Sequence, residues 1–391
     1  MISFAVVIAV APVAIAIYAY VAYPAIVWFI VRIRPRAGLP PRSHDWPAVT
    51  ITVPVYNAVA TIGNTLERLL GVDYPSDRLQ FVVMSDASND GTDDLVRTFA
   101  KRGVELVRAP VRRGKTAAEN AAVGVARGDI IVNVDATVVI PRGSLKQLIC
   151  AFDDPTVGVA SGRDVSVGRG DSQDAGPESG YTGYEMRLRA LETRAGSIVG
   201  ASGCFYGIRR SIRGSPLPAG LSWDFASTLV AREQGYRSVS VPGAVCLVPR
   251  TVEIKSELRR KARTMARGLG TLFHFRALMN PFKYGGFALM LISHKLFRWL
   301  PYLMVPAALV ALGVLATRSA LAAVLLAITT FSVLIGAASI TYASSIRFKP
   351  LVFAGFVVAV ISAGFLAWVD VIRGARMATW DPTPRPSVTH T

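Results

Sequence analysis

The sequence predicts an α/β fold, with a mainly parallel sheet, joined to transmembrane helices. Strand-like apolar runs alternate with helix-like segments between residues 48 and 135. Three of these runs end on polar side chains, and long uncharged stretches flank the region on both sides. Alternation of this kind is typical of βαβ units, in which helices cover a parallel sheet. Because ligands bind at the carboxyl ends of such strands, the polar side chains there are candidate site residues.

Composition indicates a membrane protein. The 391 residues are 52% hydrophobic and only 18% charged, which is too apolar for an ordinary soluble enzyme. Residues 2–31 carry no charge and run into Arg32, Arg34 and Arg36. This stretch exceeds the roughly 20 residues that cross a bilayer. Its positive charge follows the apolar run, so we expect a retained anchor and not a cleaved signal peptide.

Three further apolar stretches, at about 299–317, 319–342 and 351–372, are each long enough to span a membrane. Together with the anchor they predict five regions. These are a transmembrane anchor at 1–31, an α/β domain at 32–270, interfacial helices at 271–298, about three transmembrane helices at 299–372, and a tail at 373–391.

The distribution of charge indicates the class of partner. The net charge is +17, and the basic residues gather at 32–42 and 250–298, beside the predicted spans. Aromatic side chains do not interleave with them, so membrane lipids and an anionic substrate are expected as partners and nucleic acid is not.

Cys150, Cys204 and Cys246 are odd in number and lack metal-ligand spacing, which fits a reducing compartment without disulfides.

Within the α/β domain, hydrophobic period and turn residues predict the order of elements. Strands are expected near 49–54, 79–85, 104–108 and 130–134, and helices near 59–71, 91–102 and 116–126. The segment 168–183 is rich in Gly, Asp and Ser, so it is expected to form a surface loop.

Seven motifs follow one another in this domain. They are PVYN, SDASNDGT, GKTAAENAA, VDAT, GASGCFYGIRR, SWDF and an Arg-rich segment at 253–276. Neither GxGxxG after the first strand nor a GxxxxGK phosphate loop occurs. In this order the motifs resemble those of the membrane-integrated family 2 glycosyltransferases of GT-A fold, related to the cellulose, chitin and hyaluronan synthases. The resemblance covers about residues 48–270.

The resemblance implies a nucleotide-sugar donor, with a UDP-sugar first and GDP and dTDP carriers left open. It assigns donor binding to groups at the strand ends and to two basic side chains: Val55, Tyr56, Asn57, Asp86, Ser88, Lys115 and Arg260. A Tyr ring can stack on a base, and a carboxylate can accept from a base or ribose. Two structural alternatives stay open, since Asp86 could cap a helix and Lys115 could belong to a solvated basic loop.

Asp135 matches the first acidic residue of the DxD motif of this family, which implies Mg²⁺ or Mn²⁺ bound beside the diphosphate. The third position of the motif is Thr137 here, so the chain supplies one carboxylate and a hydroxyl. A purely structural Asp135 is the alternative.

Asp224 in SWDF precedes Gly235 and Tyr236 by the spacing that relatives show between the catalytic Asp and a Gly-Tyr turn. The resemblance therefore implies that Asp224 is the general base, and it places the acceptor near Gly203, Cys204 and Trp223. Trp223 stands where relatives often carry an acidic residue. A helix N-cap is the structural alternative for Asp224.

The Arg-rich segment is expected to form a helix on which Arg259, Arg263 and Arg267 share one face. Arg263 matches the Arg of the family signature QxxRW and is assigned to the leaving diphosphate. Arg260 and Thr264 stand at the Gln and Trp positions, which disfavours long processive synthesis.

The expected function is inverting transfer of a sugar from a nucleotide-sugar donor to a polysaccharide or lipid-linked acceptor, by a multi-pass protein of the cell membrane whose catalytic domain faces the cytosol. A membrane-tethered nucleotide- or sugar-binding protein that has lost catalysis is the alternative. A transporter is disfavoured because the predicted spans carry almost no charge.

Overall fold

The computed structural model describes residues 2–33, 45–167, 177–249, 254–341 and 349–374. These residues form two compact units, one drawn from 27–251 and the other from 1–26 and 252–375. Each unit is described by itself.

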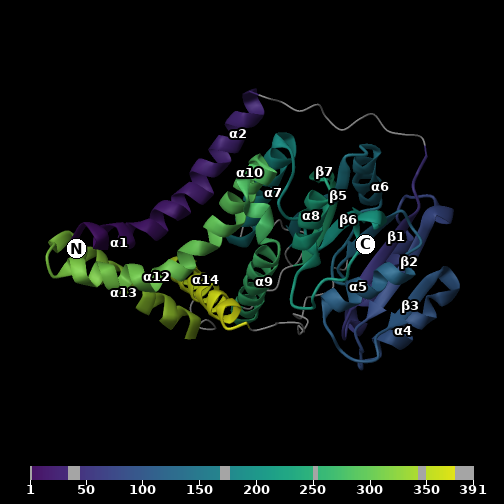
Figure 1. Cartoon of the computed structure of the whole chain (residues 1–391). Helices are drawn as coiled ribbons and strands as arrows, with labels where there is room; N and C mark the ends of the chain where they lie inside the picture. The colour runs from purple at the N-terminus through teal and green to yellow at the C-terminus, as the bar shows by residue number, and fades with distance from the viewer. Residues whose placement is uncertain (1, 34–44, 168–176, 250–253, 342–348, 375–391) are drawn as a thin grey trace. The chain divides into compact units, whose positions relative to one another are not determined.

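The unit within 27–251 contains a seven-stranded sheet with strand order β3-β2-β1-β4-β6-β5-β7 (Figure 1). Its first four strands are β1 (Val49–Val55), β2 (Leu79–Ser85), β3 (Val104–Arg108) and β4 (Ile130–Val134). They pair in parallel, and their bounds confirm the predicted strands to within one residue. The remaining strands are β5 (Val157–Val167), β6 (Phe205–Arg209) and β7 (Arg237–Pro249). Only β6 runs antiparallel to its neighbours, β4 and β5, so the sheet is mainly parallel as predicted.

Helices cover both faces of this sheet. They are α3 (Val59–Leu70), α4 (Thr92–Thr98), α5 (Lys115–Val125), α6 (Ser144–Ile149), α7 (Pro177–Ala195) and α8 (Trp223–Glu233), with 3₁₀ turns at Ser76–Arg78, Ala100–Arg102, Cys150–Asp153 and Arg210–Ile212. On α3 the apolar residues Ile62, Leu66 and Leu69 recur at helical spacing, and all three are buried in the main core. Because strand side chains alternate, Val83 joins that core while Val82 and its neighbours on the other face pack against α5.

Two expectations need correction. The predicted helix at 91–102 is α4 followed by a 3₁₀ turn that ends at Gly103, whose φ of 86° is in the left-handed region. The predicted surface loop at 168–183 is helical from Pro177 onward, and its residues 168–176 lie outside the described part of the chain. Composition concealed this helix because its first turns contain glycine and serine.

The other unit is helical. It contains α1 (Ile2–Ile17), a π-helix at Tyr18–Ala22, the start of α2 (Tyr23–Ile33), α9 (Ile254–His274), a 3₁₀ turn at Arg276–Met279, α10 (Pro281–Tyr284), α11 (Gly286–Leu291), a π-helix at Ile292–Leu296, α12 (Phe297–Ala316), α13 (Ala320–Thr341) and α14 (Lys349–Ile372). Helix α1 packs along α12, and α14 packs against α9 and α13.

Among the described residues, four helical segments are long and apolar enough to cross a membrane: Ile2–Ile33, Gly286–Ala316, Ala320–Ala338 and Ala354–Ile372. The second of them begins upstream of the predicted stretch at 299–317, and so includes Lys295 and Arg298. Arg298 is buried, and its guanidinium lies 4.9 Å from the ring centre of Tyr20. An apolar segment tolerates this charge because an aromatic face and neighbouring helices shield it.

Candidate active site

The carboxyl ends of β1, β2 and β4 form the edge of the sheet where the candidate site lies. Val55 at the end of β1 is in register with Ser85 at the end of β2, and β1 also pairs with β4 in parallel. The residues that follow these strands are Tyr56, Asp86 and Asp135. The predicted parallel order therefore gathers the three polar strand ends at one edge.

Lys115, the first residue of α5, is the centre of the site. Its ammonium nitrogen lies 2.6 Å from Oδ1 of Asp135 and donates to the carbonyl oxygen of Gly203 at 3.0 Å. Burial disfavours the charged form, but the carboxylates of Asp135, Glu119 and Asp224 outweigh it and raise the pKa of Lys115 above its ordinary value. Lys115 is thus a cation bound by Asp135 and by the carbonyl oxygen of Gly203, which disfavours the alternative of a solvated basic loop.

Asp224 approaches this cation in the first turn of α8. The hydroxyl of Ser222, the N-cap residue, donates to its Oδ1. A Cβ atom added at Gly203 would lie 2.9 Å from its Oδ2, closer than real Cβ contacts, so any other residue there would force this carboxylate to shift. The backbone N–H of Ala201 also donates to the carbonyl oxygen of Asp224 at 3.1 Å. Asp224 is therefore held from two sides. Ser222, and not Asp224, occupies the N-cap position, and its side chain makes no capping hydrogen bond.

A chain of hydrogen bonds from Asp164 through Ser202 to Cys204 supports the backbone at Gly203 and Cys204. Ser202 Oγ donates to Asp164 at 2.6 Å and accepts from the backbone N–H of Cys204 at 3.1 Å. The carbonyl oxygen of Cys204 in turn accepts the N–H of Asp135 at 3.1 Å. Ser202 and Asp164 were not predicted. Ser202 lies inside the GASG motif, but no sequence signal connects Asp164 with the site.

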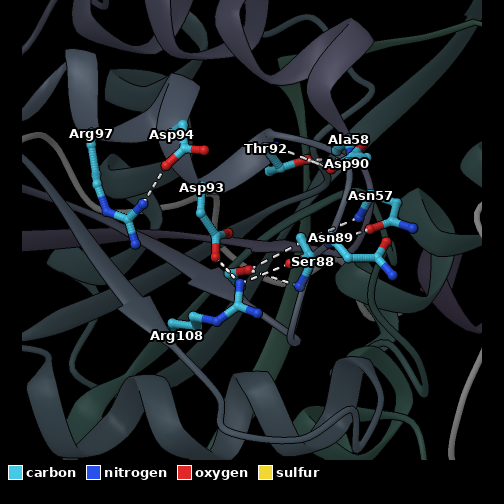
Figure 2. A network of polar contacts seen from close by, with 11 residues as sticks. Asn57, Ala58, Ser88, Asn89, Asp90, Thr92, Asp93, Asp94, Arg97 and Arg108 are labelled. Carbon is cyan, nitrogen blue, oxygen red and sulfur yellow. Dashed lines mark hydrogen bonds and ion pairs between the residues drawn. The ribbon is translucent and has the colours of Figure 1, made fainter.

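A polar network joins the loops that follow β1 and β2 (Figure 2). Asn57, at φ 48°, donates its N–H to Ser88 Oγ at 3.1 Å, and its side-chain oxygen accepts from the N–H of Asn89 at 3.0 Å. Arg108 donates to the carbonyl oxygen of Ser88 at 2.8 Å and pairs with Asp93. In this structure Asn57 and Ser88 thus hold two loops together, and their predicted contact with the donor stays a prediction.

Asp86 holds a third loop. Its side chain is 1% exposed, and its two oxygens accept the consecutive backbone N–H groups of Arg113 and Gly114, each at 2.7 Å. Gly114 has φ 91° and ψ 167°, a conformation that is essentially restricted to glycine. The described contacts make Asp86 the anchor of the loop 109–114, and its predicted contact with the nucleotide stays a prediction.

Arg112, in this anchored loop, lies over Tyr56. The guanidinium carbon is 3.8 Å from the centre of the tyrosine ring, and both side chains are half-buried. One face of Tyr56 therefore carries a planar cation, and the predicted stacking of a base on this ring stays a prediction.

Trp223 belongs to a buried layer behind Asp224. The indole is 2% exposed, its N–H donates to Asn120 Oδ1 at 2.7 Å, and Arg213 lies 4.2 Å from the ring centre. Tyr206 is also buried, and its hydroxyl lies 3.5 Å from Glu119. Burial raises the pKa of Tyr206 well above its ordinary value. These contacts pack α8 against α5, and the burial of Trp223 does not favour its predicted contact with an acceptor.

A divalent ion would have to rely on Asp135. No group of three or more His, Cys, Asp or Glu side chains in the described ranges could hold a metal ion. Lys115 donates a hydrogen bond to Oδ1 of Asp135. Oδ2 of Asp135 accepts none from the described residues, so this oxygen could bind an ion. Because Mg²⁺ is commonly held by one or two carboxylates completed by substrate phosphates, the site fits such an ion only together with a diphosphate.

The predicted site residues divide between the two units. Val55, Tyr56, Asn57, Asp86, Ser88, Lys115, Asp135, Gly203, Cys204, Trp223 and Asp224 belong to the sheet-containing unit. Arg260 and Arg263 lie on α9 in the helical unit, so their predicted roles toward the donor stay predictions. The three cysteines, all in the described part of the chain, form no disulfide. Cys246 is buried, and Cys150 and Cys204 are partly buried.

Part of this chain is similar in sequence to a known protein family and to known enzymes. The family described as Glycosyl transferase family 2 matches residues 50–214, which run from β1 past Gly203. The N-acetylglucosaminyltransferase of Mesorhizobium japonicum is 27% identical over 228 residues, covering 54% of this chain and 53% of that protein. The N-acetylglucosaminyltransferase of Rhizobium meliloti is 27% identical over 244 residues, covering 58% and 57%. The chain thus spans about half the length of these curated relatives.

One solved structure is similar over nearly its whole length. The mannosyltransferase PcManGT from Pyrobaculum calidifontis, in complex with GDP-Man and Mn²⁺, aligns with a TM-score of 0.69 at 26% identity. The alignment covers 93% of this chain and 98% of that one. Residues 50–214 thus match the family 2 glycosyltransferases, and the mainly parallel sheet to which they belong is GT-A-like.

Proposed function

We propose that this chain is an enzyme that transfers a sugar, with inversion, from a nucleotide-sugar donor to a polysaccharide or lipid-linked acceptor at a membrane. The observation that carries the proposal is the position of Lys115. Its ammonium lies 2.6 Å from Asp135, interacts with Asp224 and is bonded to Gly203. A cation beside two carboxylates at the carboxyl edge of a parallel sheet suits a diphosphate that gains charge as it leaves.

The donor is proposed to bind at the ends of β1, β2 and β4. The similarity to a mannosyltransferase in complex with GDP-Man and Mn²⁺ supports a nucleoside diphosphate sugar. UDP-sugars and GDP-sugars are both candidates, since the curated relatives are N-acetylglucosaminyltransferases. Asp135 would hold Mg²⁺ or Mn²⁺ together with the donor diphosphate, and such an ion neutralises phosphate charge.

Asp224 is proposed to act as the general base. Its carboxylate would take the proton from the acceptor hydroxyl, whose oxygen forms a new bond to the anomeric carbon. The bond from that carbon to the phosphate oxygen breaks, and its electron pair leaves with the nucleoside diphosphate. Ser222 would orient the carboxylate, and Lys115 would stabilise the charge of the departing diphosphate.

The membrane is proposed to supply or receive the acceptor. Four candidate spans support a multi-pass protein of the cell membrane, and the catalytic domain would face the cytosol, where nucleotide sugars are made. The regions predicted from the sequence, with the catalytic domain at 32–270, remain part of this proposal. The departures from QxxRW at Arg260 and Thr264 favour short products or a lipid-linked acceptor over a long polymer.

The proposal is tested by incubating full-length protein in native membranes with a panel of labelled UDP-, GDP- and dTDP-sugars. Label should enter either a lipid extract or a water-soluble glycan for one sugar, and the Asp224→Asn variant should slow that transfer about 10²–10⁴-fold. Nucleotide binding without transfer by the wild type, in both fractions and with every sugar, would instead favour the membrane-tethered binding protein.

A further inference from the structure

Asn120 lies in α5 and ties this helix to the segment that leads into α8. Its side-chain oxygen accepts the backbone N–H of Leu217 at 3.1 Å and the indole N–H of Trp223 at 2.7 Å. Its amide nitrogen donates to the carbonyl oxygen of Leu217 at 2.8 Å. A side-chain amide oxygen has two acceptor positions, and both are filled here. The orientation of this side chain is therefore set, although the proposed reaction does not use it.

Helix α5 makes a second contact with the same segment. Thr116, which is fully buried, donates its hydroxyl to the carbonyl oxygen of Leu221 at 2.6 Å. Residues four apart on a helix share one face, so Thr116 and Asn120 together hold the segment 217–223 along α5. Lys115 begins the same helix. One helix thus carries the cation of the site and also the attachment of the segment that leads to the proposed base.

Trp223 connects this attachment to Asp224. The indole is 2% exposed, and while Asn120 binds its N–H at one edge, the guanidinium carbon of Arg213 lies 4.2 Å from its ring centre. Arg213 is itself 3% exposed, so the ring is enclosed on an edge and on a face. Trp223 and Asp224 are consecutive residues in the first turn of α8. A shift of the indole would therefore displace the backbone that carries the carboxylate.

We propose that Asn120 is a positioning residue for the transfer reaction, and that it acts through Trp223 to hold the carboxylate of Asp224 in place relative to Lys115. In this role Asn120 acts only through its three hydrogen bonds, which set the distance between α5 and the first turn of α8. In the proposed reaction the base removes a proton while the diphosphate departs, so base and cation must be placed correctly at the same time.

This inference rests on the proposed function, in which Asp224 is the general base. A purely structural role for Asn120 is the alternative. Loss of a structural contact would lower transfer by the same factor whether or not residue 224 can act as a base. Combining changes at the two positions therefore separates the two roles.

The experiment measures kcat for transfer of the labelled sugar in native membranes, per amount of full-length protein, in the wild-type and Asp224→Asn backgrounds. Asn120→Ala should lower kcat about 10–10²-fold in the wild-type background, as expected when a catalytic group is misplaced by about 1 Å. In the Asp224→Asn background the same change should lower kcat by less than about twofold, because residues that act as a unit are not additive. The dissociation constant of the nucleoside diphosphate, measured by calorimetry, should change little in either background.

Two further variants decide the question if Asn120→Ala does not fold. Trp223→Phe removes the indole N–H and keeps an aromatic ring, and it should lower kcat on the order of tenfold, again only while Asp224 is present. Asn120→Asp keeps an acceptor for both N–H groups and loses only the donor. It should therefore retain more activity than Asn120→Ala.

Gln234→Ala is the matched control. The side-chain amide of Gln234 donates to the carbonyl oxygen of Ile212 at 2.9 Å, at the other end of the connection between β6 and α8. Gln234 is the C-cap residue of α8, whereas Asp224 lies in the first turn of that helix. Loss of this hydrogen bond should therefore leave kcat unchanged.

The inference is wrong if Asn120→Ala or Trp223→Phe lowers kcat by the same factor in both backgrounds, or if either variant transfers sugar at the wild-type rate. Full activity of Asp224→Asn by itself would instead refute the proposed base, and absence of transfer by the wild type would refute the proposed function. The failures are therefore distinguishable.

Discussion

Lys115 and Asp135 face each other with the ammonium nitrogen 2.6 Å from Oδ1, although they come from a helix start and a strand end 20 residues apart. The pair joins α5 to β4 at the edge of the sheet. Since Asp224 and Gly203 also interact with Lys115, this one side chain connects three separate segments of the candidate site.

Replacing Lys115 by Met should lower kcat about 10²–10³-fold, because the leaving diphosphate loses a fixed cation. Sugar transfer to the acceptor found in membranes measures the effect. Lys115→Arg, which keeps the charge, should retain more activity than Met. Lys146→Met is the control, because Lys146 forms its ion pair with Asp73 at the surface, away from the strand ends. Equal activity in the two Met variants would contradict the role of Lys115.

Asp224→Asn should reduce kcat about 10²–10⁴-fold while the dissociation constant of the nucleoside diphosphate stays within about twofold. Asparagine keeps the size of the side chain but cannot accept the proton. Transfer assays and calorimetry on the same preparation separate the two quantities. Glu233→Gln, at the exposed end of the same helix, provides the control. Transfer at the wild-type rate by Asp224→Asn would remove the general base from the mechanism.

Gly203→Ala should abolish most activity, about 10²-fold in kcat, with little loss of stability. The new Cβ would lie 2.9 Å from Oδ2 of Asp224, and the carboxylate at the end of a flexible side chain can move away more easily than backbone can. A misplacement of a catalytic group by about 1 Å can lower the rate about 10²-fold. Gly214→Ala, with no atom within 4 Å of its Cβ, should leave both kcat and Tm unchanged. A Gly203→Ala variant of normal activity would show that Asp224 does not need its present position.

The alkaline limit of stability should depend on Lys115. Its pKa is raised in the folded protein, so its contribution to stability is fully present below the unfolded pKa of about 10.4 and is lost as pH rises through the folded pKa. Tm measured from pH 7 to 11 should therefore be insensitive to this group up to about pH 10 and fall above it. In Lys115→Met the fall should be shallower. An identical decline in both proteins would contradict the assignment.

Asp86→Asn should destabilise the sheet-containing unit by about 1–3 kcal/mol, because one of the two N–H groups of the loop would meet an amide N–H₂ instead of an acceptor. Nucleotide binding should weaken as the loop loosens. Chemical denaturation and calorimetry measure the two effects. Asp77→Asn, an exposed surface change, should alter neither. Weaker nucleotide binding at unchanged stability would instead indicate that Asp86 contacts the nucleotide directly.

Most strands and helices of the domain could be predicted because each is encoded locally. The apolar residues of β1 to β4 form short runs between turn residues, and Ile62, Leu66 and Leu69 recur at helical spacing. The start of α7 was missed because local composition there favours a loop, whereas α7 gains its stability from packing against β5 and β7.

The candidate site was predictable only in part. Motif order placed Tyr56, Asp86 and Asp135 at strand ends, and parallel pairing brings such ends to one edge. Spacing along the chain could not reveal that Asp164 supports Ser202, or that Asp86 anchors the loop of Arg112. These contacts join residues that are far apart in sequence.

Periodicity, charge and motif order are local properties, so the fold class, the apolar spans and the candidate metal ligand, base and cation could be predicted from the sequence alone. The folded structure was needed to show which carboxylate meets Lys115, how closely Gly203 approaches Asp224, and that Arg112 lies over Tyr56. Such relationships depend on distances of a few ångströms between separate loops, and those distances are set by the packing of the whole domain.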